Sequence, residues 1–119
     1  MVTWTTDASS SNRITLTEYP GEQAEIVGTM LALEGDYLTV RDLAIRDVQR
    51  VDDDCVSSGG TGERLEHNLI QRCARHGILL HTTTRNVTVT RNFVDDVGLN
   101  SGNSAPDHGI YVQGSGGTV

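Results

Sequence analysis

Three segments of the sequence share one pattern of apolar and polar residues. They are YLTVRDLAIRDV (37–48), GERLEHNLIQRC (62–73) and NVTVTRNFVDDVG (86–98), and their starts lie 25 and 24 residues apart. A fixed period of this length is typical of solenoids, in which each repeat buries its apolar face only against its neighbours. The repeat therefore predicts a stack of similar coils.

The apolar residues of the repeat alternate, which predicts short strands with one buried face. A helical solenoid would need apolar residues at i, i+3, i+4 and i+7, and segments this rich in Thr, Val, Asn and Gly are poor helix formers. Alignment without gaps gives three apolar columns, which are Val40, Leu65 and Val89; Ile45, Ile70 and Val94; and Val48, Cys73 and Val97.

Two or three strands per turn, with Asn recurring at one corner, predict a parallel β-helix of about four to five coils. We expect Asn68 and Asn92 to adopt left-handed backbone angles at that corner and to hydrogen-bond between coils. Leu43 occupies the same column and should end this ladder. Residues 1–119 are expected to form a single all-β domain, the N-terminal coils of a larger one.

The composition excludes some classes of partner and site. A net charge of −7 and a pI near 4.8 argue against nucleic acid as a partner. No apolar run reaches the roughly 18 residues of a membrane span, and residues 1–13 lack the pattern of a signal peptide. Cys55 and Cys73 are too few for a disulfide framework and lack metal-binding spacing, so we expect Cys73 to be a core residue and not a reactive thiol.

Four segments carry a family resemblance, and they are ITLTEYPGEQAEIVG, GDYLTVRDLAIRDV, HNLIQRCARHGILL and NVTVTRNFVDD. They resemble the right-handed parallel β-helix, or pectate-lyase-like, superfamily, over residues 14–119. The resemblance implies a right-handed solenoid, a carbohydrate-facing groove along parallel strands, and an extracellular or cell-surface location for the full-length protein. It implies part of a polysaccharide lyase, glycoside hydrolase or uronan epimerase. The alternative is a non-catalytic solenoid such as a phage tailspike or surface adhesin.

The acidic run VDDDC (51–55) contains the first candidate catalytic residues, Asp53 and Asp54. Mutual repulsion should raise the pKa of at least one carboxyl group, and such clusters act as acid and base or as ligands for hard cations such as Ca²⁺. A solvated loop is the plain alternative. The run followed by His76 and Gly77 is similar to the Asp-Asp-Cys and Gly-His-Gly segments of polygalacturonase-type hydrolases, although Arg75 replaces the first Gly and the chain has no Lys.

Two near copies, His76-Gly77-Ile78 and His108-Gly109-Ile110, supply the other candidate catalytic residues, His76 and His108. We expect Gly to make a tight corner, Ile to be buried and each His to lie at the rim. The candidate substrate-binding residues are Arg75, Asp107 and Tyr111. We expect no transition-metal site, because HGILLH places its two His side chains on opposite faces of a strand.

The loop of residues 99–107 lengthens one coil. In solenoids such insertions shape the wall of a binding groove, although a neutral surface excursion fits equally well.

Overall fold

The protein is a stack of short parallel strands. The structure, a computed structural model, describes residues 1–102 and 106–119. Its strands are β1 (Val2–Trp4), β2 (Ile14–Leu16), β3 (Ala24–Val27), β4 (Leu31–Leu33), β5 (Leu38–Arg41), β6 (Leu43–Val48), β7 (Val56–Ser58), β8 (Arg64–Glu66), β9 (Leu69–Cys73), β10 (Ile78–Leu80), β11 (Thr88–Thr90), β12 (Phe93–Asp95) and β13 (Ile110–Val112). No helix occurs among the described residues.

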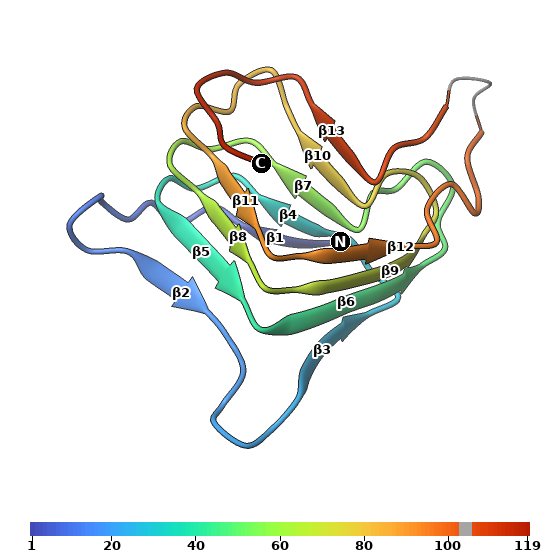
Figure 1. Cartoon of the computed structure of the whole chain (residues 1–119), viewed down its shortest axis with the longest axis horizontal. Helices are drawn as coiled ribbons and strands as arrows, with labels where there is room; N and C mark the ends of the chain where they lie inside the picture. The colour runs from blue at the N-terminus through green and yellow to red at the C-terminus, as the bar shows by residue number, and fades with distance from the viewer. Residues whose placement is uncertain (103–105) are drawn as a thin grey trace.

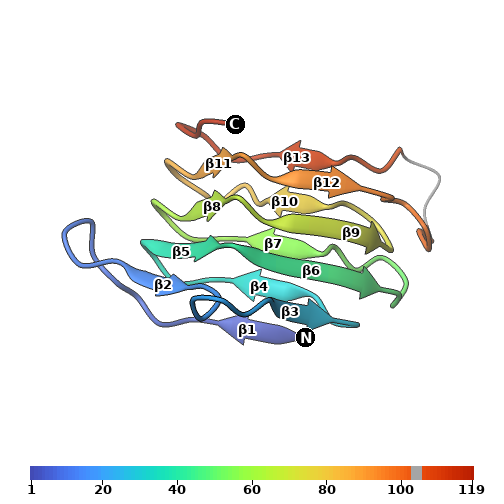
Figure 2. The same ribbon diagram turned by 60° about the horizontal axis from the view of Figure 1, so that its bottom comes forward.

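The strands form three parallel sheets, each of which takes one strand from every coil. Sheet I has the order β1-β4-β7-β10-β13, sheet II β2-β5-β8-β11 and sheet III β3-β6-β9-β12. Figures 1 and 2 show the chain winding around the three sheets in a right-handed sense. The expected all-β parallel β-helix is confirmed, with four coils of three strands each and β13 in a fifth.

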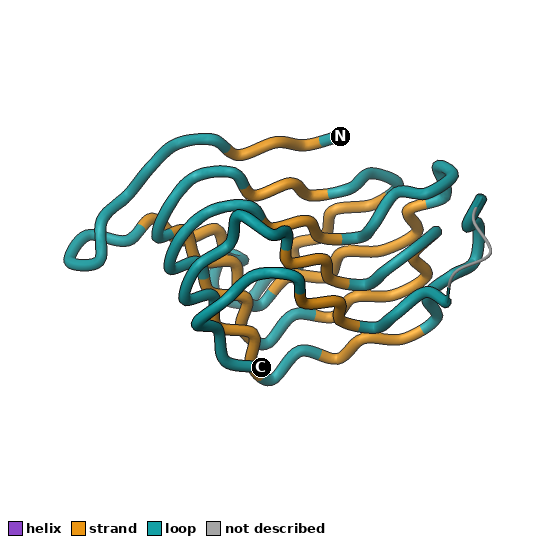
Figure 3. The backbone as a smooth tube through the Cα atoms, turned by 90° about the horizontal axis from the view of Figure 1, so that it is seen from above, coloured by secondary structure: helices purple, strands orange, loops and turns teal. Residues whose placement is uncertain are grey.

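The predicted apolar columns are confirmed as vertical stacks inside the coils. Leu65 pairs in register with Val40 on one side and Val89 on the other, and all three side chains are buried. Ile45, Ile70 and Val94 form the second stack in the same way, and the third begins with Val48 paired to Cys73. Figure 3 shows the successive strands lying one above another along the solenoid.

The Asn ladder is confirmed with two rungs. The amide oxygen of Asn92 accepts hydrogen bonds from the Asn68 main-chain N–H at 2.9 Å and from the Asn68 side-chain amide at 3.0 Å. The amide oxygen of Asn68 in turn accepts from the Leu43 N–H at 3.2 Å. Leu43 has no polar side chain to extend the series, so the ladder ends there.

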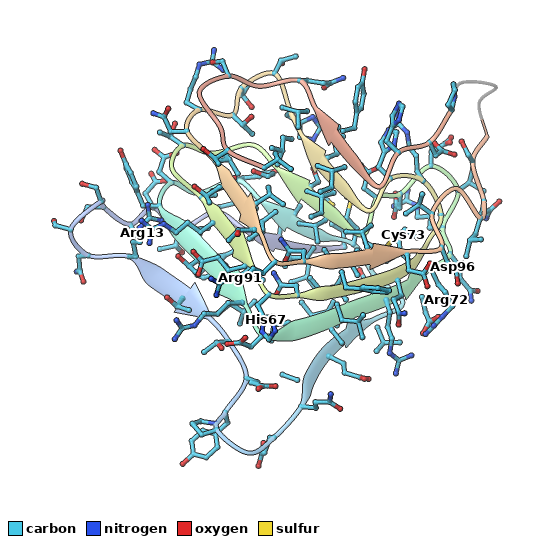
Figure 4. All side chains as sticks on the ribbon, in the orientation of Figure 1. Arg13, His67, Arg72, Cys73, Arg91 and Asp96 are labelled. Carbon is cyan, nitrogen blue, oxygen red and sulfur yellow. A yellow bond between two sulfur atoms is a disulfide. The ribbon has the colours of Figure 1, made fainter. Side chains whose placement is uncertain are left out.

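The expectation that these Asn residues adopt left-handed backbone angles is wrong. The left-handed residue is the one before each of them, His67 or Arg91, and Asp42 before Leu43 does the same, with φ between 54° and 58°. Similar columns open sheet II (Tyr37, Gly62, Asn86 and Gly116) and lie near the end of sheet III (Asp47, Arg72 and Asp96). Figure 4 shows His67 with Arg91, and Arg72 with Asp96, at these two corners. Within each coil, left-handed residues five positions apart therefore bend the chain before sheet II, between sheets II and III, and near the end of sheet III. Their side chains differ from coil to coil.

Cys55 and Cys73 form a disulfide across the interior, which the low cysteine count had led us not to expect. Both are fully buried, so the prediction that Cys73 is a core residue is correct, but it is not a free thiol. The bridge joins the chain just before β7 to the last residue of β9.

Glu63 is a charged residue inside the core. It is 0% exposed, and its Oε2 accepts a hydrogen bond from the Ser58 hydroxyl. Its Oε1 has no partner among the described residues. Burial raises the pKa of this carboxyl group to about 7, against the hydrogen bonds from Ser58 and the Gly60 main chain, which lower it.

Removing the disulfide should destabilise the protein. Its two cysteines are 18 residues apart, and a loop of that length gives about 3 kcal/mol of stabilisation in the chain-entropy description. We expect Cys55→Ala/Cys73→Ala to lose about this much in urea unfolding, and reductant to bring the wild-type protein to the same midpoint. A wild-type midpoint unmoved by reductant would show that the bridge is absent.

Glu63 should make stability fall as pH rises. The folded pKa of about 7 exceeds the ordinary value of 4.5, so the folded state holds the proton more tightly across this window and the free energy of unfolding declines by about 3 kcal/mol. In Glu63→Gln this part of the decline should vanish, whereas Glu34→Gln, which alters an exposed carboxyl group, should keep it. Parallel curves for wild type and Glu63→Gln would contradict a buried carboxyl group.

Candidate active site on sheet I

Three of the four candidate catalytic residues occupy one column at the edge of sheet I. Val56, Ile78 and Ile110 are paired in register, and Asp54, His76 and His108 each precede one of them by two residues. Because parallel strands start at the same edge of a sheet, these three residues, one from each of three consecutive coils, lie above one another along that edge. Figure 1 shows β7, β10 and β13 side by side along this edge.

Each member of the column is hydrogen-bonded to the next coil. Asp54 Oδ1 accepts from the His76 main-chain N–H at 3.2 Å, and His76 Nδ1 accepts from the His108 main-chain N–H at 2.9 Å. The column thus repeats the principle of the Asn ladder, with a side-chain acceptor on one coil and a main-chain donor on the next. It fixes the orientation of both Asp54 and His76.

Tyr111 completes an aromatic cluster with the two histidines. The rings of His76 and His108 are stacked, with centroids 5.5 Å apart and an interplanar angle of 16°. Tyr111 lies 5.1 Å from His76 and 5.0 Å from His108. Sheet register places Tyr111 beside Leu79 and Ser57 on the face of sheet I that points away from the core.

The two His-Gly-Ile copies are not equivalent, and the expectation that both His lie at the rim is wrong for His76. His76 is 2% exposed beneath the coil that follows it, whereas His108 is exposed. Gly77 serves close packing here: a Cβ at this position would lie 2.6 Å from the carbonyl oxygen of Gly109. The next coil therefore covers His76.

Burial, more than repulsion within the acidic run, sets the protonation of Asp54. Asp54 is 5% exposed, and burial is the largest cause that raises its pKa. The His76 main-chain N–H and the charge of Arg75 lower it, and the charge of Asp53 is the smallest of the contributions. The repulsion within the acidic run that the sequence predicted therefore contributes little to the raised pKa of Asp54. For His76, burial and the charge of Arg75 lower the pKa and favour the neutral ring.

The remaining predicted residues lie around this column at different depths. Arg75 and Asp107 are close enough to shift the pKa of His76 in opposite directions. Asp107 packs over Gly98, whose N–H donates to the Arg75 carbonyl oxygen at 2.8 Å. Asp53 is joined to Arg75 only through its main-chain carbonyl, at 3.0 Å. Hence Arg75, His76, Asp107, His108 and Tyr111 lie close together, Asp54 is hydrogen-bonded to His76, and Asp53 lies next to Asp54.

The beginning of the 99–107 loop runs beside this site. Leu99 and Asn100 donate main-chain hydrogen bonds to Cys73 and Ala74, and the Gly102 N–H donates to Asp52 Oδ1 at 2.8 Å. Residues 103–105 lie outside the described part of the chain, so the groove wall expected there stays a prediction.

Ser57 and His81 form a neighbouring pair that sequence reasoning missed. Ser57 Oγ lies 2.7 Å from His81 Nε2. His81 follows β10, and its charge lowers the pKa of Asp54, so this pair adjoins the column. The signal was available: in the register of β7 and β10, Ser57 is an outward position between buried Val56 and Ser58.

An open groove lies elsewhere, at the corner between sheets II and III. This groove of about 700 Å³ is lined by corner residues that include Asp42, His67 and Arg91, with exposed Phe93 beside them. His67 Nδ1 contacts Asp42 Oδ1 at 2.7 Å, but the pair is largely exposed and worth little energetically. We favour sheet I as the candidate site, because two buried ionisable side chains, Asp54 and His76, are held there in a fixed geometry and His76 belongs to an aromatic cluster.

The described residues contain neither a metal-binding cluster nor a membrane-spanning helix. No group of three or more His, Cys, Asp or Glu side chains is arranged to hold a metal ion. No helix long and apolar enough to cross a membrane is found in residues 1–102 and 106–119.

Comparison with known proteins adds no identification: no family model, curated protein or solved structure matches the chain.

The origin of the Asp54 shift can be tested by titration. If burial dominates, the Asp54 carboxyl carbon should titrate above its ordinary pKa of 3.8 in ¹³C NMR, and Asp53→Asn should change the midpoint little. Arg75→Gln should move the midpoint up, because it removes a charge that lowers it. A midpoint that returns to the ordinary value in Asp53→Asn would instead favour repulsion within the acidic run.

Proposed function

We propose that this protein binds an extended polysaccharide on the outward face of sheet I, and that in its complete form it modifies this polysaccharide. One observation carries the proposal: the rings of His76, His108 and Tyr111 form an aromatic cluster in the column that begins with the oriented carboxyl group of Asp54. Aromatic rings beside a few fixed polar groups are the usual composition of a binding site for an organic ligand. The resemblance to pectate-lyase-like proteins agrees with a carbohydrate as that ligand.

The shape of the site suits a long polymer. Adjacent strands of a sheet are roughly 4.8 Å apart, so equivalent positions of β7, β10 and β13 offer side chains at regular intervals along the solenoid. A polymer lying across these strands meets Tyr111 and His108 and passes over Asp54 and His76, which are buried. A compact ligand would use only one or two of these levels.

Hydrolysis is the reaction that these residues serve best. Glycoside hydrolases use one carboxylic acid to protonate the leaving oxygen and a second carboxylate to act on the opposite face of the sugar. Asp54, whose pKa is raised by burial, suits the acid, and Asp107 is the second carboxylate of the cluster.

The disulfide supports a location outside the reducing cytosol. Disulfides persist in secreted, periplasmic and surface proteins and are rare in the cytosol. The bridge between Cys55 and Cys73 flanks the site on both sides, since Asp54 precedes one cysteine and Arg75 and His76 closely follow the other. We therefore propose that the full-length protein acts at the cell surface or beyond it.

Polysaccharide binding should depend on Tyr111 and not on exposed aromatic residues in general. We expect Tyr111→Ala to weaken binding in affinity electrophoresis at least tenfold, because it removes one ring of the cluster. Phe93→Ala is the matched control: Phe93 is 59% exposed but lies on β12 of sheet III.

Two results would count against the proposal. If Phe93→Ala weakens binding and Tyr111→Ala does not, the ligand lies in the corner groove and not on sheet I. If the wild-type protein binds none of a broad panel of acidic and neutral polysaccharides, the solenoid is better described as a structural rod.

A further inference from the structure

Three buried polar atoms in the sheet I cluster have no hydrogen-bond partner among the described residues. They are Arg75 Nε, His76 Nε2 and Asp107 Oδ1. Leaving a buried polar atom unpaired costs about 1–3 kcal/mol, so three in one cluster require an explanation. A single polar group that bonds to all three would satisfy them.

The hydrogen-bonding role of each atom is fixed by its surroundings. His76 Nδ1 accepts the His108 main-chain N–H at 2.9 Å, so in the neutral ring the proton is on Nε2, which becomes a donor. Arg75 Nε is always a donor, and a carboxylate oxygen of Asp107 is an acceptor. The missing partner must therefore accept two hydrogen bonds and donate one. A single hydroxyl group does both.

The charges of the cluster disfavour an anionic partner. The carboxyl groups of Asp54 and Asp107 lie near one guanidinium group, that of Arg75, which influences both Asp54 and His76. Asp53 adds a further negative charge next to Asp54, and the whole chain has a net charge of −7. A carboxylate placed between the three atoms could accept from Arg75 and His76, but it would face Asp107 with no proton to donate.

We propose that Arg75, His76 and Asp107 bind one hydroxyl group of a neutral sugar residue, and that the preferred ligand is a neutral polysaccharide and not a uronic acid polymer. The inference rests on the proposed polysaccharide-binding function and names its substrate class. His76 is then a ligand-binding donor with a fixed tautomer. The sugar reaches the three atoms from the side of His108, whose exposed ring rotates away from its stack on His76.

This ligand class narrows the chemistry. Elimination and epimerisation both begin by removing the proton next to a uronic acid carboxylate, which a neutral sugar lacks. Hydrolysis needs no such group, only an acid and a second carboxylate. The two acidic residues of the cluster, Asp54 and Asp107, meet that requirement without a cation to neutralise the substrate.

Binding of neutral and acidic oligosaccharides of equal length tests the inference. Calorimetry on the wild-type protein should give neutral mannan, xylan or glucan fragments at least tenfold tighter binding than polygalacturonate or polymannuronate fragments. Asp107→Asn keeps an acceptor but removes the charge, so it should narrow this preference. Asp95→Asn removes the same charge from an exposed residue on sheet III and should leave the preference unchanged.

The role of His76 has its own readout, which does not depend on a variant that folds poorly. In ¹⁵N NMR of the wild-type protein, His76 Nε2 should be protonated and Nδ1 unprotonated, and the Nε2 resonance should shift when a neutral oligosaccharide is added. His76→Phe keeps an aromatic ring without the donor and should weaken neutral binding roughly tenfold.

Each other outcome overturns a defined part of the account. Equal or tighter binding of acidic fragments would refute the neutral-sugar inference and leave polysaccharide binding intact. No binding of either class would refute both. Unchanged binding in His76→Phe, with a His76 Nε2 resonance that ignores the ligand, would mean that the three atoms hold only a buried water.

Discussion

Every part of this structure depends on the stacking of equivalent residues in adjacent coils. A single coil of about 24 residues cannot enclose an apolar core, so Val40, Leu65 and Val89 are buried only because each lies on the next. The main chain follows the same rule, since every strand pair in the three sheets joins different coils. This stacking also offsets the cost of a left-handed backbone at residues such as Asp42, His67 and Arg91, which disfavour it in isolation.

The same rule builds the candidate site. Asp54, His76 and His108 have different chemistry but equivalent positions, so the solenoid places them in a column without any dedicated loop. The hydrogen bonds along that column copy the Asn68–Asn92 ladder at another corner. A site made in this way is as rigid as the core beneath it, and the Cys55–Cys73 bridge joins the two ends of the coil formed by β7, β8 and β9, next to Asp54 and His76.

Structural features that recur from coil to coil could be predicted from the sequence, and features that occur in only one coil could not. The apolar columns, the Asn ladder and the clustering of His76 with His108 and Tyr111 follow from aligning segments, because alignment in a solenoid is contact in space. The disulfide joins Cys55 to Cys73, which occupy different positions of the repeat, so no alignment could pair them. The burial of His76 depends on the coil above it. Two identical His-Gly-Ile segments therefore differ in exposure for a reason that neither segment contains.

The left-handed residues could not be located from the backbone preference of Asn, because the path of the main chain decides which residue bends. Asn favours such angles, yet the side chains of Asn68 and Asn92 form the ladder. The left-handed residues are the ones before them, His67 and Arg91. Spacing was the better guide, since Tyr37, Asp42 and Asp47 are separated by five residues each and recur in the next coils.

Methyl contacts measured by NMR test the stacking most directly. With selectively labelled methyl groups, the account predicts nuclear Overhauser effects from Leu65 to both Val40 and Val89, and from Ile70 to both Ile45 and Val94. The residues of each pair are 24 or 25 positions apart in the sequence and lie on neighbouring coils. Contacts confined to residues close in sequence would contradict the stacked solenoid and the site built on it.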